Sequence, residues 1–410
     1  MKLIFFRKNW KPVFCFFGGL REISAATALI DFDNKKIKIK KYFYYFNNSE
    51  EGFGEEDFIK ILSRLLKKVS KKTPVIICFE QPFTKSSKVR LSVVRENPLS
   101  PLEYEDLENI ILNLAWRIYD KERIFVSQKM KISEWDVALA NSKITEPRVD
   151  DKKVLNPLGF TCKTLSFYLE NTYFHALFWD AIKTTLEQWG GELLFLGEKN
   201  LLFDKIFSLI NNTEPAVSVE IGYSSTGIGI LSDYLNSFKY FDWGEKNLLR
   251  SISQNLSTSF DLAQEIKKIY EKGDMGENAK NWFKKLFEKE WKLLIEGVIL
   301  ATKDFSVDKK IKKIYLFGFL KKFPLLIEAF QKQKWPTAIF SNPVSISFYS
   351  NEQFLNDTEI DLEQPANEIS FNLLLTLSYP FLADSKYEEM NKILKRRIKW
   401  LNQNILKHHK

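Results

Sequence analysis

The residues best suited to chemistry form a short turn between two apolar runs. Apolar residues alternate with small or polar ones over residues 217–221 and again over residues 227–231, which is the period of a β-strand. Gly222 lets the backbone turn where a side chain would clash. The turn combines backbone amides with hydroxyl groups, an array that can hold a phosphate. Its polar residues are Tyr223, Ser224, Ser225 and Thr226. An ordinary hairpin in a mixed sheet is the alternative interpretation.

A strand, a glycine turn and a second strand also occur near the N-terminus. The apolar run 12–17 ends at Gly18 and Gly19. Strands are predicted over residues 24–32 and 36–46, joined by a turn. The same local architecture therefore occurs twice in the chain.

The segment between the two turns is predicted to contain a small inserted domain. A helix over residues 55–71 and a buried strand over residues 75–81 precede it. Within it we expect a strand from residue 88, a helix with Ser100 as N-cap that runs from Tyr104 to Tyr119, and strands over residues 123–130 and 133–141. A helix over residues 173–189 follows the insert.

The elements after the second turn are mainly helices. Ser259 or Asp261 can cap a helix that ends at Gly273. A longer helix is expected over residues 278–301, and a strand reaches Gly318.

The hairpin, the turn at Gly244 and the stretch SFDLAQEIKKIY (residues 259–270) resemble the bacterial actin-like ATPases that include the cell-division protein FtsA and the pilus protein PilM. The turn at residues 156–159 resembles the return from the inserted subdomain of FtsA. The resemblance implies an α/β, actin-like (ribonuclease H-like) duplicated fold with an inserted small α+β subdomain. The expected domains are residues 1–82 with 159–212 (first half), 83–158 (inserted interaction subdomain), 213–382 (second half, with a helical subdomain over 245–303) and 383–410 (amphipathic membrane-targeting tail).

The same resemblance implies ATP and Mg²⁺ as cofactors, held by three motifs. The residues at these motifs are Gly18, Gly19, Glu220, Gly222, Tyr223, Ser224, Ser225, Thr226 and Gly318. The first motif has Phe16 where the family has an aspartate, and the second has Glu220 and Gly227 at its two aspartate positions. Phe319 and Leu320 follow Gly318 in place of a further glycine. These departures predict weak or absent ATP binding, at most a weak ATPase, and neither a catalytic residue nor a metal site.

Composition limits the classes of partner. The chain has 410 residues, 45% hydrophobic and 28% charged, as expected of a globular protein with two or more domains. The net charge of +9 suggests an anionic surface as partner, either membrane or nucleic acid, although a lysine-rich composition alone explains it equally well. No specific nucleic-acid partner is predicted. Cys15, Cys78 and Cys162 are isolated, which excludes disulfide or metal spacing and fits a reducing cytoplasm.

The C-terminal residues combine an apolar stripe, a tryptophan and a dense basic face. Such a helix suits the surface of an anionic membrane, where each cation adds about 1 kcal/mol. The residues expected to bind it are Ile393, Leu394, Arg396, Arg397, Ile398, Lys399, Trp400, Leu401 and Ile405. A terminal helix packed on its own domain is the alternative.

With the family resemblance, these features predict a cytoplasmic, FtsA-like scaffold for cell division on the inner face of the cell membrane. Self-association into filaments would present many tails at once and raise membrane residence. The tubulin-like protein FtsZ is the partner that the family implies. A PilM-like adapter for type IV pilus assembly is the alternative, favoured by the short segment 271–277. An actin-fold kinase or ATPase and a nucleic-acid binder are further alternatives.

Overall fold

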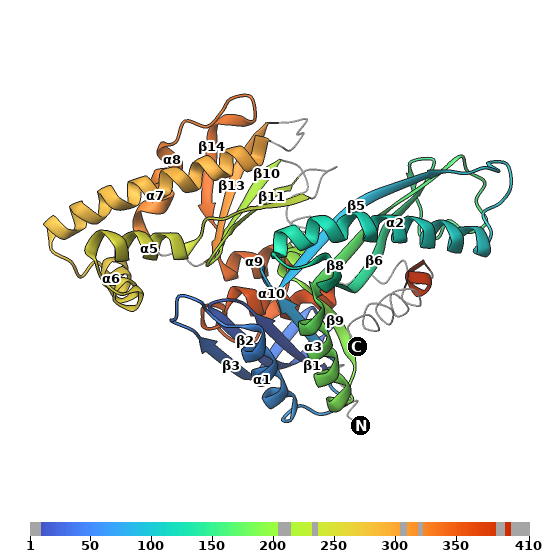
Figure 1. Cartoon of the computed structure of the whole chain (residues 1–410), viewed down its shortest axis with the longest axis horizontal. Helices are drawn as coiled ribbons and strands as arrows, with labels where there is room; N and C mark the ends of the chain where they lie inside the picture. The colour runs from blue at the N-terminus through green and yellow to red at the C-terminus, as the bar shows by residue number, and fades with distance from the viewer. Residues whose placement is uncertain are drawn as a thin grey trace, which may run out of the picture.

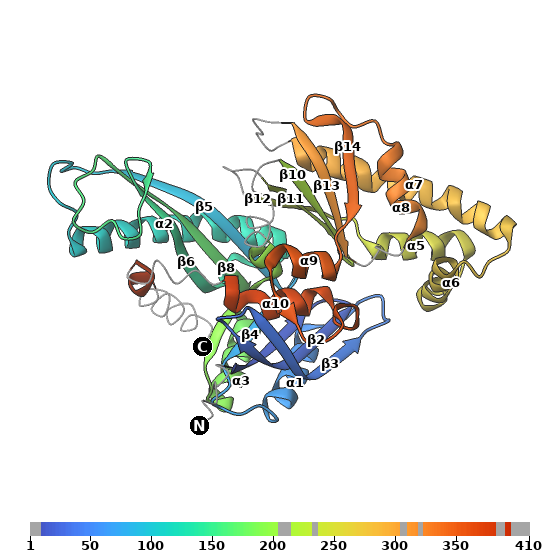
Figure 2. The same ribbon diagram turned by 180° about the vertical axis from the view of Figure 1, so that it is seen from behind.

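The structure is a computed structural model that describes residues 10–203, 215–231, 237–303, 310–318, 323–382 and 390–394. These residues form two mixed β-sheets, each covered by helices, and an antiparallel sheet that projects to one side (Figure 1). The view from behind shows α9 (Asn351–Thr358) and α10 (Phe371–Leu382) lying between the two mixed sheets (Figure 2).

The first sheet has the strand order β15-β3-β2-β1-β4-β9. β1 is antiparallel to β2 and parallel to β4, which is parallel to β9, so the carboxyl ends of β1, β4 and β9 lie at one edge. Helices α1 and α3 pack on one apolar face and α10 on the other. The bounds are β1 (Trp10–Gly18), β2 (Glu22–Asp31), β3 (Lys36–Phe46), α1 (Glu55–Leu66), β4 (Val75–Phe79), α3 (Ala176–Trp189), β9 (Leu193–Glu198), β15 (Asp361–Leu362) and α10 (Phe371–Leu382).

The second sheet has the strand order β12-β11-β10-β13-β14. β10 pairs antiparallel with β11 and parallel with β13, which confirms the predicted strands on both sides of Gly222. A core built around Trp291 and Phe323 joins the sheet to its helices. The bounds are β10 (Ala216–Ile221), β11 (Thr226–Leu231), β12 (Ser237–Phe241), α5 (Glu245–Leu256), α6 (Phe260–Lys272), α7 (Glu277–Lys303), β13 (Ile311–Gly318), α8 (Pro324–Lys332) and β14 (Phe340–Phe348).

The inserted subdomain is an antiparallel sheet of order β5-β8-β6-β7 with one long helix across it. The bounds are β5 (Thr84–Val94), α2 (Tyr104–Met130), β6 (Val137–Val149), β7 (Lys152–Lys153) and β8 (Thr164–His175). Because β8 lies between β5 and β6, the insert extends to His175 and the predicted boundary at residue 158 is too early.

A predicted strand and a predicted helix cap of the insert are wrong. Residues 123–130 continue α2 and form no strand, because Tyr119 and Val126, seven residues apart, occupy the same buried helix face. The helix begins at Tyr104 as predicted, but its N-cap is Glu103 and not the predicted Ser100. Ser100 accepts a hydrogen bond from Arg95 at 2.8 Å through its carbonyl, and Pro101 pairs with Thr161 in a β-bridge.

The helix predicted over residues 173–189 begins only at Ala176, because Tyr173 and Phe174 complete β8. A second boundary also changes. The chain after β14 returns to the first sheet, where β15 pairs with β3 and α9 (Asn351–Thr358) packs with α10. Residues 351–382 therefore join the first half, although the sequence places them in the second.

Candidate functional site

The carboxylate of Glu80 lies in the first glycine turn, beside Gly19 and Leu20. Glu80 directly follows β4, whose carboxyl end lies beside that of β1. The backbone amide of Leu20 donates a 2.7 Å hydrogen bond to Glu80 Oε1. A Cβ on Gly19 would lie 2.6 Å from the same oxygen, so a larger residue there would displace the carboxylate from this position. The turn therefore already binds a negatively charged group, which is the protein's own Glu80 carboxylate.

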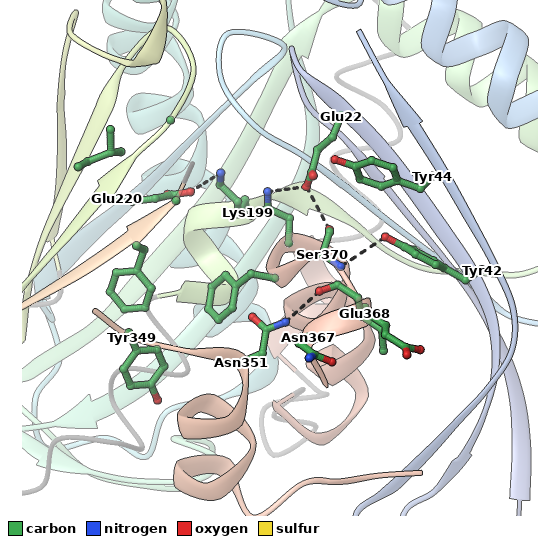
Figure 3. A pocket seen from close by; sticks show the side chains of 17 residues that line it. Glu22, Tyr42, Tyr44, Lys199, Glu220, Tyr349, Asn351, Asn367, Glu368 and Ser370 are labelled. Carbon is green, nitrogen blue, oxygen red and sulfur yellow. Dashed lines mark hydrogen bonds and ion pairs between the residues drawn. The ribbon is translucent and has the colours of Figure 1, made fainter. Parts of the chain in front are cut away.

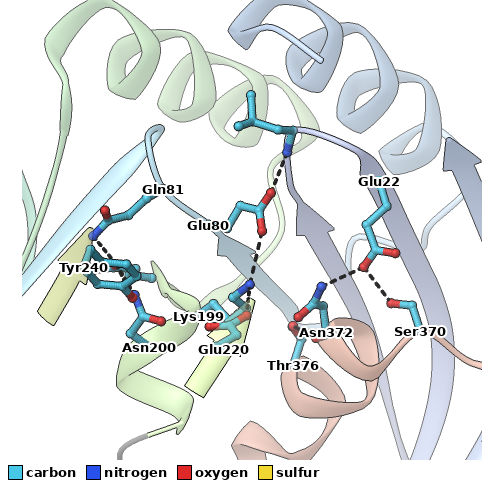
Figure 4. Close-up of polar contacts among 12 residues, drawn as sticks. Glu22, Glu80, Gln81, Lys199, Asn200, Glu220, Tyr240, Ser370, Asn372 and Thr376 are labelled. Atoms are coloured by element: carbon cyan, nitrogen blue, oxygen red, sulfur yellow. Dashed lines mark hydrogen bonds and ion pairs between the residues drawn. The ribbon is translucent and has the colours of Figure 1, made fainter. Parts of the chain in front are cut away.

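Lys199 connects this carboxylate to the second sheet (Figure 4). Its Nζ lies 3.1 Å from Glu80 Oε2 and also forms an ion pair with Glu220, the penultimate residue of β10. All three side chains are buried. Burial disfavours the charge on Lys199, but Glu220 and Glu80 outweigh that effect and raise the pKa of Lys199. The ammonium group thus lies between a carboxylate of each half.

A second buried contact joins the two glycine turns. The guanidinium carbon of Arg21 lies 4.4 Å from the ring centroid of Tyr223. Arg21 Nη1 donates to the carbonyls of Asn47 at 2.5 Å and Ser49 at 3.3 Å. The Tyr223 hydroxyl donates to the carbonyl of Glu50 at 2.9 Å. Arg21 is 1% exposed, so this stack is removed from solvent.

The loop of residues 47–50 fastens the first half to helices of the second. The Glu50 carboxylate lies 2.7 Å from Arg250 Nη2 and 3.8 Å from Lys246 Nζ, both on α5. Gln264 on α6 donates to the carbonyl of Asn48. These contacts hold the two halves together at the turns.

A cavity of about 480 Å³ lies between the halves beside these contacts (Figure 3). The first half contributes Glu22 from β2 and Tyr42 and Tyr44 from β3. Glu22 accepts hydrogen bonds from Ser370 Oγ at 3.1 Å and Asn372 Nδ2 at 2.8 Å. Burial raises the pKa of Glu22, which these hydrogen bonds lower only in part. The remaining lining residues include Lys199, Glu220, Gly222, Phe317, Gly318, Tyr349, Asn351, Asn367 and Glu368.

The structure brings together most of the predicted nucleotide-binding positions. Gly222 and Gly318 line the cavity, and Ser224 and Ser225 line a smaller pocket beside Lys199. Gly318 has a φ of +101°, and a Cβ there would lie 2.0 Å from the carbonyl oxygen of Ile221. Thr226 has a structural role, because its hydroxyl donates to the carbonyl of Trp243 at 2.7 Å.

One predicted correspondence is corrected. Phe16 faces the core under α1 and α3, so it is not the residue of β1 that faces the site. Phe17, on the opposite face, lies 5.7 Å by its ring centroid from Lys199 Nζ. Neither Phe16 nor Phe17 is a carboxylate, so the first motif still lacks the aspartate that the family has. Phe319 and Leu320 lie outside the described residues.

Sequence reasoning missed the polar groups that define this site: Arg21, Glu22, Glu80, Lys199 and Asn351. A signal for Glu80 was present, because it follows a buried strand directly. Parallel strands bring their carboxyl ends to one sheet edge, where such residues meet.

The residues do not fit a metal-bound nucleotide in this arrangement. The amide of Leu20 is already bound by Glu80, and the Lys199 ammonium is already paired with Glu80 and Glu220. The cavity wall adds the carboxylate of Glu22, which would repel a phosphate. Among the described residues, no group of three His, Cys, Asp or Glu side chains is placed to hold a metal.

The C-terminal residues that the structure describes lie on the insert. Ile393 and Leu394 are 2% and 1% exposed and pack with Met390 against the core of the insert. Asn391 accepts from the Ile144 amide at 2.7 Å and donates to its carbonyl at 3.1 Å. For Ile393 and Leu394, this arrangement agrees with the alternative prediction, in which the C-terminal residues pack on the protein itself and do not face lipid. Arg396, Arg397, Ile398, Lys399, Trp400, Leu401 and Ile405 lie outside the described residues.

Similar structures establish the fold class. The structure titled the PilM–PilN type IV pilus biogenesis complex matches 91% of this chain and 99% of that chain, with a TM-score of 0.59 and 11% identity. A putative N-acetylmannosamine kinase from Listeria monocytogenes matches 90% of this chain and 98% of its own, at a TM-score of 0.45 and 10% identity. An activator of 2-hydroxyisocaproyl-CoA dehydratase from Clostridium difficile with bound ADPNP matches 94% and 97%, at 0.36 and 8%. No family model and no curated protein matches the sequence. The chain has an actin-like ATPase fold, as the resemblance implied.

Proposed function

We propose that this protein is a non-enzymatic actin-fold adapter that holds a partner protein in an assembly of the PilM type. The observation that carries the proposal is the match to PilM, which spans 91% of this chain and 99% of that one. PilM is in a complex with PilN in that structure. The internal contacts at the glycine turns support a role that does not need nucleotide turnover.

The insert offers a surface for such a partner. Ile124, Phe125 and Trp135, which we call the insert patch, lie near the C-terminal end of α2 and are 45%, 53% and 66% exposed. Arg123 lies 5.0 Å from the Trp135 ring centroid. Exposed apolar groups of this kind mark interaction sites, and Trp and Arg often dominate the binding energy.

The FtsA-type function remains a prediction. Its tail residues 396–405 lie outside the described residues, and Ile393 and Leu394 are covered by the insert. Membrane association, filament formation and an FtsZ-type partner are therefore separate proposals that need their own tests. Within the described residues, no helix has both the length and the apolar character of a membrane span.

Site-specific photo-crosslinking in cells distinguishes these functions. A photoreactive residue at position 125 or 135 should give one strong product containing a pilus- or secretion-type assembly protein. A matched position on the second half, Trp282 on α7, is 39% exposed and should give no such product. The Trp135→Ala variant should lose co-purification of the same partner. A tubulin-like division protein in the product, or equal products from positions 135 and 282, would contradict the proposal.

A further inference from the structure

The cavity between the halves has an excess of acidic groups. Its described lining contains three carboxylate side chains, Glu22, Glu220 and Glu368. Lys199 is the lysine among the described lining residues, which include no arginine. Lys199 is already paired with Glu220 and with Glu80. Within the described parts of the chain, neither Glu22 nor Glu368 forms an ion pair with a Lys or Arg. The wall therefore favours a positively charged occupant and disfavours phosphate.

Asn351 supplies a second, independent observation. It is 4% exposed at the start of α9, and its Nδ2 donates to the carbonyls of Ala366 at 2.7 Å and Ile369 at 2.9 Å. Those two bonds fix the amide, and its Oδ1 has no hydrogen-bond partner in the described structure. Figure 3 shows this oxygen among the lining side chains, on the opposite side of the amide from the hydrogen bond drawn at its nitrogen. A buried acceptor left unpaired destabilises the protein, so a donor from a bound ligand would relieve that cost.

Tyr42 and Tyr44 form an aromatic part of the wall. They lie two residues apart on β3, which places both on one face of the sheet, with ring centroids 6.2 Å apart. Tyr44 is 47% exposed, so its ring is accessible at the mouth of the cavity. The faces of tyrosine rings attract ammonium and guanidinium groups.

We infer that this cavity binds an organic cation through ammonium or guanidinium groups. The carboxylates of Glu22 and Glu368 balance its charge, its N–H groups supply the donor that Asn351 lacks, and the tyrosine rings cover its methylene groups. The cation can be a free polyamine or a Lys or Arg side chain of a partner segment. The inference goes beyond the proposed adapter function and does not depend on it.

Isothermal titration of the full-length protein tests the inference with two probes. Spermidine represents a free cation, and the capped peptide acetyl-Gly-Lys-Gly-amide represents a lysine side chain. We expect saturable binding of at least one probe. Binding of spermidine alone assigns a free cation, and binding of the peptide assigns a partner's side chain.

The variants decide whether the binding is at this cavity. Glu22→Gln retains the acceptor oxygen for Ser370 and Asn372, and it should weaken binding about tenfold, as expected for loss of one buried charge partner. Glu368→Gln, on the exposed mouth, should weaken it by about threefold. Glu352→Gln, an exposed position on α9 outside the lining, should bind like the wild-type protein. Absence of saturable binding of both probes, or equal affinity in Glu22→Gln, would overturn the inference.

Discussion

The guanidinium carbon of Arg21 lies 4.4 Å from the ring centroid of Tyr223, and this contact joins the two glycine turns. Each residue also binds the backbone of the loop 47–50, so one buried stack fixes both turns and the loop. Lys199 makes a second buried connection of this kind, because it joins Glu80 of the first half to Glu220 of the second. Arg21 and Lys199 are thus buried cations that connect the halves of the fold, in addition to the more exposed ion pairs of Glu50.

Replacing Arg21 should loosen the connection between the halves. The Arg21→Met variant loses a desolvated cation–π contact worth about 2 kcal/mol or more, and it should speed hydrogen exchange across residues 47–50. Arg250→Met removes a half-exposed ion pair with Glu50 and should cost less than about 1 kcal/mol. Denaturant unfolding and hydrogen exchange measure both effects. Equal stability of the two variants would contradict a locking role for Arg21.

Replacing Lys199 should be strongly destabilising. Lys199→Met leaves two buried carboxylates without a cation, and breaking a buried pair in this way costs about 3–5 kcal/mol. The matched control is Lys183→Met, which removes an exposed ion pair with Glu187 and should change stability by less than about 0.5 kcal/mol. Urea unfolding provides the measurement. A change in Lys199→Met as small as that in the control would show that the buried pair is not important for the fold.

The raised pKa of Glu22 predicts how stability depends on pH. Because the folded state holds this proton more tightly than the unfolded state, the stabilisation is complete below the ordinary pKa of 4.5. It is lost as pH rises through the raised folded value. The neutral variant Glu22→Gln should therefore gain stability over wild type at about pH 8 and match it near about pH 4.

The charged and titratable groups that face Glu22 are Glu80, Lys199, Tyr42 and Tyr44, and they are the same in both proteins. Thermal unfolding across the pH range gives the difference directly. A difference in stability between wild type and Glu22→Gln that is the same at all pH values would mean that protonation of Glu22 does not contribute to the pH dependence of stability.

Asn391 should hold the described C-terminal segment on the insert. Its side chain occupies both backbone groups of Ile144, so Asn391→Ala should cost about 1 kcal/mol and accelerate exchange of the Ile144 amide. Amide exchange followed by NMR tests this, with the Leu169 amide in the neighbouring strand β8 as an internal reference. Unchanged exchange at Ile144 would place the segment elsewhere in solution.

Local patterns in the sequence were sufficient for the strands and turns that build the site. The alternation around Gly222 and the glycines at 18 and 19 depend on neighbouring residues, and the structure confirms both turns. The buried network could not be predicted in this way. Lys199 meets Glu80 and Glu220 only because β4, β9 and β10 end at the same place, and neither residue spacing nor composition encodes that meeting.

The wrong prediction of a strand in the insert also arose because local sequence does not show which residues meet in the folded chain. Residues 123–130 contain β-branched and aromatic residues that fit a strand, but burial of Val126 against the sheet selects the helix. Ile393 and Leu394 fit a lipid surface and a protein surface equally well by pattern alone. Their contact with the insert depends on its position in the folded chain.

Calorimetry with Mg-ATP on the full-length protein tests the central claim that the protein's own charged groups satisfy the site at the glycine turns. We predict no saturable heat of binding at millimolar nucleotide, in wild type or in Glu352→Gln. Saturable binding of Mg-ATP that depends on Glu220 would contradict the account, because it would require Lys199 and Glu80 to leave the positions described here.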